Sequence, residues 1–326
     1  MKLIPQELQT FQAYENQYLK DFPKLRLEQE NQIQKVIEEI RQVRKNRPFT
    51  HLILEIVPLI LLLTLFALNL LWVPSLLENK LLSSLLVGTL HGILGYSFIV
   101  YTLHEGAGHG IMRKYPLANR LIFNLPRLRF ADPEYYREFH TSHHNYLGTE
   151  KDGSFSHFIS LSRFIKSISP GAGILYKNDY QVHQNPVFTK SRILAETIGL
   201  LTLVGETYLL QKTLGIGFAL LALLGLSPWI GMILDRCRET LEHRYMPANR
   251  KYGSRELGLG PLGLLIGGGP WGQPCHFSHH LAPDLQWYGQ ILLHFKVKQI
   301  LTQEQRDFFF FSLSQLKPLF KKEVMP

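Results

Sequence analysis

Four long apolar blocks constrain the fold of this chain more than any other feature of its sequence. Residues 52–73 contain no lysine or arginine, and Glu55 near their start is their single charge. Similar blocks occupy residues 81–103, 193–211 and 216–234, and only a few residues separate the two members of each pair. About 20 apolar residues are needed to cross the hydrocarbon core of a bilayer. A buried core helix would explain one such block, but four blocks in two close pairs predict membrane-spanning helices.

The charged residues predict how these spans are oriented. Of the 35 lysines and arginines, all but Lys80 and Lys212 lie in residues 1–50, 104–192 and 235–326. The positive-inside rule places basic segments of this kind in the cytoplasm, so we expect both termini there. Within the spans, Glu196 and Glu206 make the third block the weakest candidate of the four.

These features together predict an all-α, multi-pass integral membrane protein. Four transmembrane helices in two hairpins carry a helical cytoplasmic cap, formed by residues 104–192 and 235–326. Residues 1–50 are expected to be a cytoplasmic amphipathic arm, and residues 51–326 a single domain. The net charge of +9 fits attraction to anionic headgroups, because no stretch interleaves basic and aromatic residues as a nucleic-acid surface does. No signal-peptide pattern is found in the charged first 50 residues.

Histidines gather in the segments that are predicted to be cytoplasmic. Nine of the 14 fall in four clusters, namely His104 and His109; His140, His143 and His144; His243; and His276, His279 and His280. On a helix, residues three or four apart share one face, whereas an adjacent residue points about 100° away. An HXXHH segment therefore offers two imidazoles to one metal ion, at i and i+3 or i+4, and a third imidazole to a second ion. Nine imidazoles predict a two-metal site in the cap.

The ligand chemistry narrows the choice of metal and reaction. Imidazole suits zinc, copper, iron and nickel, while structural zinc usually takes cysteine as well, so we favour iron that binds dioxygen. The segment HEGAGH resembles a zinc protease motif, but its histidines are five positions apart instead of four. We expect Gly106 and Gly108 to let the helix end unwind so that both rings converge. The two cysteines form no disulfide framework, and Cys275 is assigned to packing.

The three histidine boxes resemble those of the membrane-bound fatty acid desaturases and their hydroxylase and ketolase relatives. That family carries HX(3–4)H, HXXHH and HXXHH in this order, and all three stand here at 104–109, 140–144 and 276–280. The continuation HHLAPDLQWY is similar to the family's HHL-x-P, and the resemblance covers roughly residues 50–290. His243, with Glu239 four positions earlier, is similar to a further ligand of acyl-CoA desaturases, in which asparagine stands at the earlier position.

The resemblance implies a non-haem di-iron centre of two Fe²⁺ ions that uses dioxygen to remove hydrogen from a lipid methylene. A desaturase would form a double bond, and a hydroxylase or ketolase acting on a fatty acid, sphingolipid or carotenoid would insert oxygen; the boxes fit both. No fused cytochrome motif is present, so the resemblance implies a separate electron-transfer protein of ferredoxin, rubredoxin or cytochrome type. A membrane zinc protein is a remote alternative, and a metal transporter is less favoured because no box lies within a span.

The remaining polar residues receive supporting roles. Glu105, Glu239, Glu242 and Asp152 are candidate partners that orient imidazoles through the second ring nitrogen. Whether Glu239 contacts a metal stays open, and ordinary solvated carboxylates are as good an interpretation for Glu242 and Asp152. Five histidines outside the clusters are interpreted as structural or exposed, namely His51, His91, His157, His183 and His294.

Overall fold

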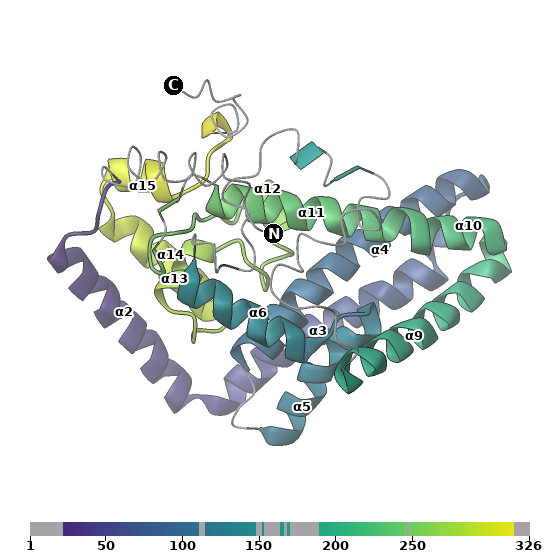
Figure 1. The fold of residues 1–326 in the computed structure, drawn as a ribbon, viewed down its shortest axis with the longest axis horizontal. Helices are drawn as coiled ribbons and strands as arrows, with labels where there is room; N and C mark the ends of the chain where they lie inside the picture. Colours follow the sequence, from purple (N-terminus) through teal and green to yellow (C-terminus); the bar gives the residue numbers. More distant parts are fainter. Residues whose placement is uncertain are drawn as a thin grey trace. The chain divides into compact units, whose positions relative to one another are not determined.

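Helices build every regular element of the described chain in the computed structural model (Figure 1). The structure describes residues 22–110, 115–147, 152, 164–165, 168–169, 189–244, 246–247 and 249–315. Within these residues the β-type pairing is limited to an isolated bridge between Glu256 and Phe310. The all-helical prediction is therefore confirmed for the described part of the chain.

The chain divides into two compact units. The first, here called the span unit, comprises Phe49–Glu138 and Val187–Asp235. The second, here called the histidine unit, comprises Met1–Pro48, Phe139–Pro186 and Arg236–Pro326.

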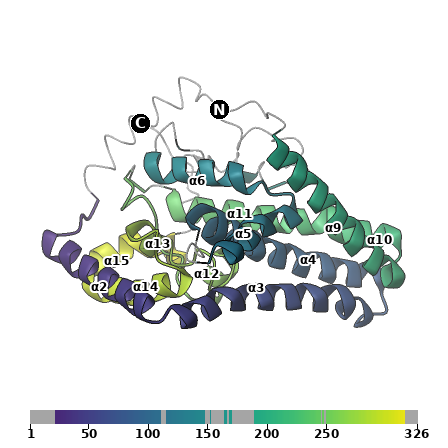
Figure 2. The same ribbon diagram turned by 90° about the horizontal axis from the view of Figure 1, so that it is seen from below.

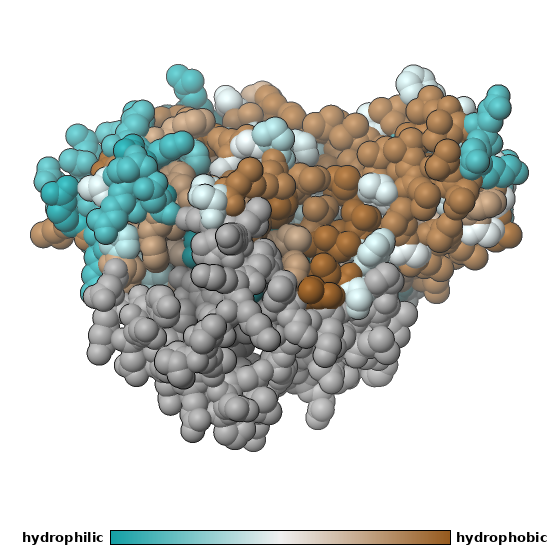
Figure 3. Space-filling view, turned by 90° about the horizontal axis from the view of Figure 1, so that it is seen from above, coloured by the Kyte–Doolittle hydropathy of each residue, from teal (hydrophilic) through white to brown (hydrophobic). Residues whose placement is uncertain are grey.

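Four long apolar helices lie where the four apolar blocks predicted them. They comprise residues 48–75 (α3, Pro48–Leu71, and η1, Val73–Ser75), 80–109 (α4, Lys80–Ile99, and η2, Val100–His109), 190–214 (α9, Lys190–Leu214) and 216–243 (α10, Ile216–Leu220, η5, Leu221–Leu226, and α11, Ser227–His243). Each is long and apolar enough to cross a membrane. Large apolar side chains such as Leu63, Leu71 and Leu201 remain exposed on them. Figure 3 shows apolar residues over a wide, continuous part of the described surface, as a lipid-facing surface requires.

Glycines let two of these helices approach closely. A Cβ atom on Gly92 of α4 would lie 2.6 Å from the carbonyl oxygen of Ser227, and one on Gly88 would lie 2.9 Å from that of Ala222. Contacts this short leave no room for any side chain, so α4 packs backbone to backbone against η5 and the start of α11. Small residues at helix interfaces are typical of membrane bundles, in which van der Waals packing replaces the hydrophobic effect.

A buried polar cluster inside the span unit explains the acidic residue in the third span. The Glu206 carboxylate of α9 lies 2.8 Å from Arg129, the last residue of η3 (Leu125–Arg129), and 3.4 Å from Nε2 of His91 on α4. Nδ1 of His91 lies 3.0 Å from the hydroxyl of Ser227. The third span is therefore a long helix whose charge is paired, and His91 has the structural place that the sequence predicted.

The histidine unit is built on a core to which the N-terminal helix contributes. Helix α2 (Leu27–Asn46) packs along α14 (Trp287–Ile300), next to α15 (Gln303–Phe309) (Figure 2). Ile33 and Ile37 are buried among Phe277, Leu293 and Phe309. Gln29 donates to the backbone carbonyl of Ile300 at 3.0 Å and to the side-chain oxygen of Gln305 at 2.8 Å. Segment 22–46, part of the predicted arm, thus supports the same core as the third histidine box.

Candidate metal centre

The two HXXHH boxes lie in the histidine unit, each on a helix. The second box is on α6 (Pro133–Tyr146), and the third forms most of α13 (His276–Leu281). In each box the first and last histidines point to one place: Nε2 atoms of His140 and His144 are 3.1 Å apart, and those of His276 and His280 are 3.2 Å apart. This i, i+4 pairing is one of the two arrangements that helical spacing allowed. The histidine at i+3 serves the other group.

One group consists of His143, His243, His276 and His280. All four side chains are buried, and one ring nitrogen of each lies within 4.8 Å of the others. Nε2 of His276 is 3.0 Å from Nε2 of His243, at the C-terminal end of α11. His143 joins the group edge to face, with its ring centroid 4.8 Å from that of His243.

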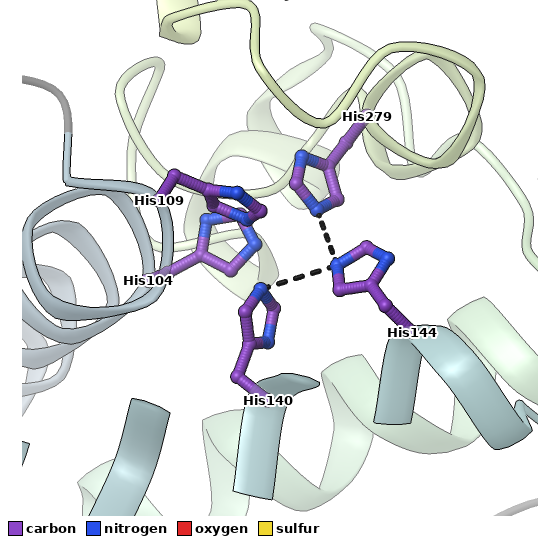
Figure 4. Close-up of side chains that lie close together, drawn as sticks. All are labelled: His104, His109, His140, His144 and His279. Carbon is purple, nitrogen blue, oxygen red and sulfur yellow. Dashed lines mark hydrogen bonds between the residues drawn. The ribbon is translucent and has the colours of Figure 1, made fainter. Parts of the chain in front are cut away.

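A second group in the same unit consists of His140, His144 and His279. Nε2 of His144 is 3.0 Å from Nε2 of His279 and 3.1 Å from Nε2 of His140, as the dashed lines in Figure 4 show. The three rings are buried, and their ligand atoms lie within 4.8 Å of one another. The two boxes therefore exchange their middle histidines: His143 joins the third box, and His279 joins the second.

The first box lies on a widened helix in the span unit. Its histidines, His104 and His109, occupy the π-helix η2, and their ring centroids are 4.9 Å apart (Figure 4). Because a π-helix bonds residue i to i+5, residues five apart face the same side. The two rings converge as expected, but the helix does not end at the glycines: it loosens into a π-helix that continues to His109. Gly106 is needed for packing, since a Cβ atom there would lie 2.7 Å from Ile122 on α5 (Pro116–Asn124).

Acceptors behind the rings determine which nitrogen carries the proton. Nδ1 of His243 lies 2.9 Å from the carbonyl oxygen of Gly253, and Nδ1 of His280 lies 3.0 Å from that of Arg250. Nδ1 of His143 lies 2.8 Å from a carboxylate oxygen of Asp152. A carbonyl oxygen only accepts, so these rings donate through Nδ1–H and each neutral ring keeps a lone pair on Nε2. Sequence patterns carried no signal for the two backbone acceptors, because any residue type supplies a carbonyl.

The converging Nε2 atoms of the first group fit a bound cation. His243 and His280 both direct an Nε2 lone pair at Nε2 of His276, at 3.0 and 3.2 Å. One Nε2–H on His276 can serve only one of these lone pairs. Charging the rings instead would place several positive charges in a buried site, at a high cost in free energy. A metal ion among the Nε2 atoms accepts every lone pair, so the donor set fits an imidazole-bound metal.

The four predicted carboxylate partners differ in their contacts. Asp152 contacts Nδ1 of His143 as described, and Glu105 lies 3.0 Å from Nδ1 of His104. Glu242 lies 3.5 Å from Nε2 of His276 and accepts a hydrogen bond from Arg238 at 3.0 Å. Glu239 pairs with the guanidinium of Arg236 at 3.4 Å.

One further contact involves a residue that the sequence analysis did not single out. The side-chain amide of Gln290 lies 3.3 Å from Nδ1 of His279 and donates at 2.9 Å to the carbonyl of Leu285. This contact between α14 and the third box was not indicated by the sequence.

Of the five histidines outside the clusters, His51 lies half-buried on α3. His157 and His183 lie outside the described residues.

Comparison with known proteins identifies a family. The family model described as fatty acid desaturase matches residues 80–311, a range that includes all nine clustered histidines. No curated protein matches the chain.

Proposed function

Because the chain belongs to the fatty acid desaturase family, we propose that it is a membrane-bound di-iron enzyme that desaturates a fatty acyl chain with dioxygen. Family membership supports oxidation of a lipid. Four helices long and apolar enough to cross a membrane support the location of the enzyme where lipid chains are. The converging Nε2 lone pairs of His243, His276 and His280 are the observation that carries the metal-dependent part of the proposal.

The nine clustered histidines are the proposed ligands. One ion would be held by His143, His243, His276 and His280, and the other by His140, His144 and His279. His104 and His109 complete the nine ligands that the sequence predicts. All-nitrogen, neutral donor sets suit Fe²⁺, and the absence of a thiolate among these nine ligands disfavours a structural zinc site. When bound, two ferrous ions with dioxygen supply the oxidising power that breaks unactivated C–H bonds.

In this proposal the protein's own residues orient the imidazole ligands and exclude bulk water from them. Asp152 and the carbonyls of Gly253 and Arg250 keep protons on Nδ1, so Nε2 stays available as a ligand atom. Burial of the imidazoles keeps bulk water away, and the packing of α13 against α14 keeps the third box in place. In this proposal Glu105 and Asp152 orient ligand rings. Glu239 does not contact a metal ion and acts on the centre through the guanidinium of Arg236, with which it pairs.

Topology and electron supply complete the proposal. We place four spans in two hairpins, with both termini and the centre on the cytoplasmic side, because the basic residues cluster in segments 1–50, 104–192 and 235–326. Electrons would come from a separate carrier of ferredoxin, rubredoxin or cytochrome type, which docks on the cytoplasmic side.

Lipid mass spectrometry after expression in a host tests the reaction. A desaturase product is two mass units lighter than its substrate, whereas a product heavier by one oxygen atom would identify a hydroxylase instead. Metal analysis of the detergent-purified protein tests the centre: we expect about two iron ions per chain, lost when His143 and His279 are both changed to alanine. His51→Ala is the matched control and should keep both ions. Zinc without iron, from cells grown with both metals, would overturn the di-iron proposal.

A further inference from the structure

A third group of metal-ligand side chains lies in the histidine unit and shares no residue with the nine histidines. It consists of Glu256, Cys275 and His294, whose ligand atoms all lie within 4.8 Å of one another. Their exposed fractions are 0%, 1% and 5%. Three different donor types, each able to bind a metal, are therefore packed together in the protein interior.

Hydrogen bonds leave two polar atoms of this group unaccounted for. Oε1 of Glu256 accepts from the backbone N–H of Ser278 at 3.0 Å and from its hydroxyl. Among the described residues, the second carboxylate oxygen of Glu256 and Nδ1 of His294 have no hydrogen-bond partner, although both are buried. Buried polar atoms are nearly always paired, so two in one cluster indicate a missing ligand.

A simple ion pair between His294 and Glu256 does not explain the cluster. Nδ1 of His294 is 3.5 Å from Oε1 of Glu256, which is longer than an ordinary hydrogen bond, and that oxygen already accepts from Ser278. Such a pair would leave the second carboxylate oxygen without a partner and give the Cys275 thiol no role.

We propose that Cys275, His294 and Glu256 bind a divalent metal ion, and that this ion is zinc. Thiolate, imidazole and carboxylate are the three ligand types that zinc takes in proteins, and a thiolate favours zinc over harder ions. On binding, the Cys275 thiol releases its proton to solvent, and the thiolate and carboxylate together neutralise the two charges of the ion. Neutrality matters here because the cluster is buried and an uncompensated charge would be costly.

The position of the cluster indicates a structural role. Cys275 directly precedes α13, and His294 lies on α14. The backbone of Glu256 forms hydrogen bonds with the backbone of Phe309 and Phe311, near the end of the described chain. A bound ion would therefore tie three segments together next to the third histidine box. The Ser278 amide, held by Glu256, lies between the box histidines His276 and His279.

Counting metal ions in three versions of the purified full chain tests this site. We expect Cys275→Ser to contain one zinc ion fewer per chain than the wild type, with the metal content of the nine histidines unchanged. Cys237→Ser is the matched control, since Cys237 belongs to no ligand group among the described residues, and should equal the wild type. Equal zinc content in wild type and Cys275→Ser would overturn the proposal. If Cys275→Ser does not fold, His294→Gln takes its place with the same expected loss.

X-ray absorption at the zinc edge gives a signature that the nine histidines cannot produce. A sulfur atom about 2.3 Å from zinc is expected in the wild type and should be absent in Cys275→Ser. A wild-type zinc shell without sulfur contradicts the proposal. The sulfur-bound zinc should persist when His143 and His279 are changed to alanine, so a failure of the di-iron proposal and a failure of this one are distinguishable.

Discussion

Nε2 of His144 and Nε2 of His279 lie 3.0 Å apart, although 135 positions separate the two residues in the chain. The contact joins the second histidine box on α6 to the third on α13, inside one compact unit. Each box also sends one histidine to the group of the other, so neither helix can shift without disturbing both groups. The affinity for both proposed metal ions should therefore depend on residues that contact the Nδ1 atoms of these ligand rings.

Asp152 is such a residue, because its carboxylate contacts Nδ1 of His143. Asp152→Asn keeps the shape but removes the charge that supports the ring, so metal affinity should fall by about 10- to 100-fold. Competition with a chelator, followed by metal analysis, measures this change. Asp307→Asn, which alters an exposed carboxylate of α15, should leave metal affinity unchanged. Equal metal retention in Asp152→Asn and wild type would show that Asp152 has no part in the centre.

The largely buried pair of Glu206 and Arg129 should contribute far more to stability than an exposed pair on the same helix. Glu206→Gln leaves the guanidinium of Arg129 without its buried partner, which typically costs about 3–5 kcal/mol. Glu196→Gln breaks the exposed pair of Glu196 with Arg192 and should cost less than about 1 kcal/mol. Unfolding in detergent compares the two variants.

A double variant separates lost pairing from lost packing at that site. Changing Arg129 to methionine together with Glu206 to leucine removes both charges, and should recover much of the stability that Glu206→Gln alone loses. A double variant as unstable as the single one would mean that the pair acts through shape and not through charge.

Gly92 and Gly95 on α4 provide a matched pair for testing the close helix contact. Gly92→Ala would bring its Cβ atom to 2.6 Å from a backbone oxygen of Ser227, so we expect a loss of about 1–3 kcal/mol. At Gly95 nothing lies within 4 Å of the added atom, and Gly95→Ala should be neutral or stabilising by up to about 1 kcal/mol. Thermal unfolding of the two variants measures the difference, and equal stability would rule out the tight packing of α4.

Asp284 links the N-terminal helix to the third box in a pH-dependent way. Burial acts to raise the pKa of Asp284, but the hydrogen bonds and charge of Arg41, 2.6 Å away, outweigh it and the pKa is lowered. A lowered folded-state pKa stabilises the fold above the unfolded-state value of about 3.9, and this contribution is lost as the pH falls through the folded-state value.

Asp284→Asn should therefore be less stable than wild type at neutral pH, by about 0.2–1 kcal/mol, because both partners are partly exposed and screened by solvent. The difference should vanish at acidic pH, below the lowered pKa. Denaturant unfolding of both proteins between neutral and acidic pH measures it. A difference that stays constant with pH would assign the effect to packing instead of charge.

Local patterns were enough to locate the spans and the clustered histidines. Hydropathy is a property of about 20 consecutive residues, so the four helices lie where blocks such as 52–73 predicted them. Helical spacing within one HXXHH segment likewise limited the partners of the first histidine to i+3 or i+4. Family membership, now shown by the match over residues 80–311, was carried by the same local boxes.

Contacts between distant segments decided what those patterns left open. Tertiary packing selected the i, i+4 pairing and brought His143 to His243. The packing of several helices determines where an imidazole points, and the spacing of residues along one helix does not. Tertiary packing also brought Cys275, which directly precedes the third box, to Glu256 and His294, which no sequence pattern marks as metal ligands. Pairing of Glu206 with Arg129 is of the same kind, since a charge in a span is neutralised only by a partner that the fold supplies.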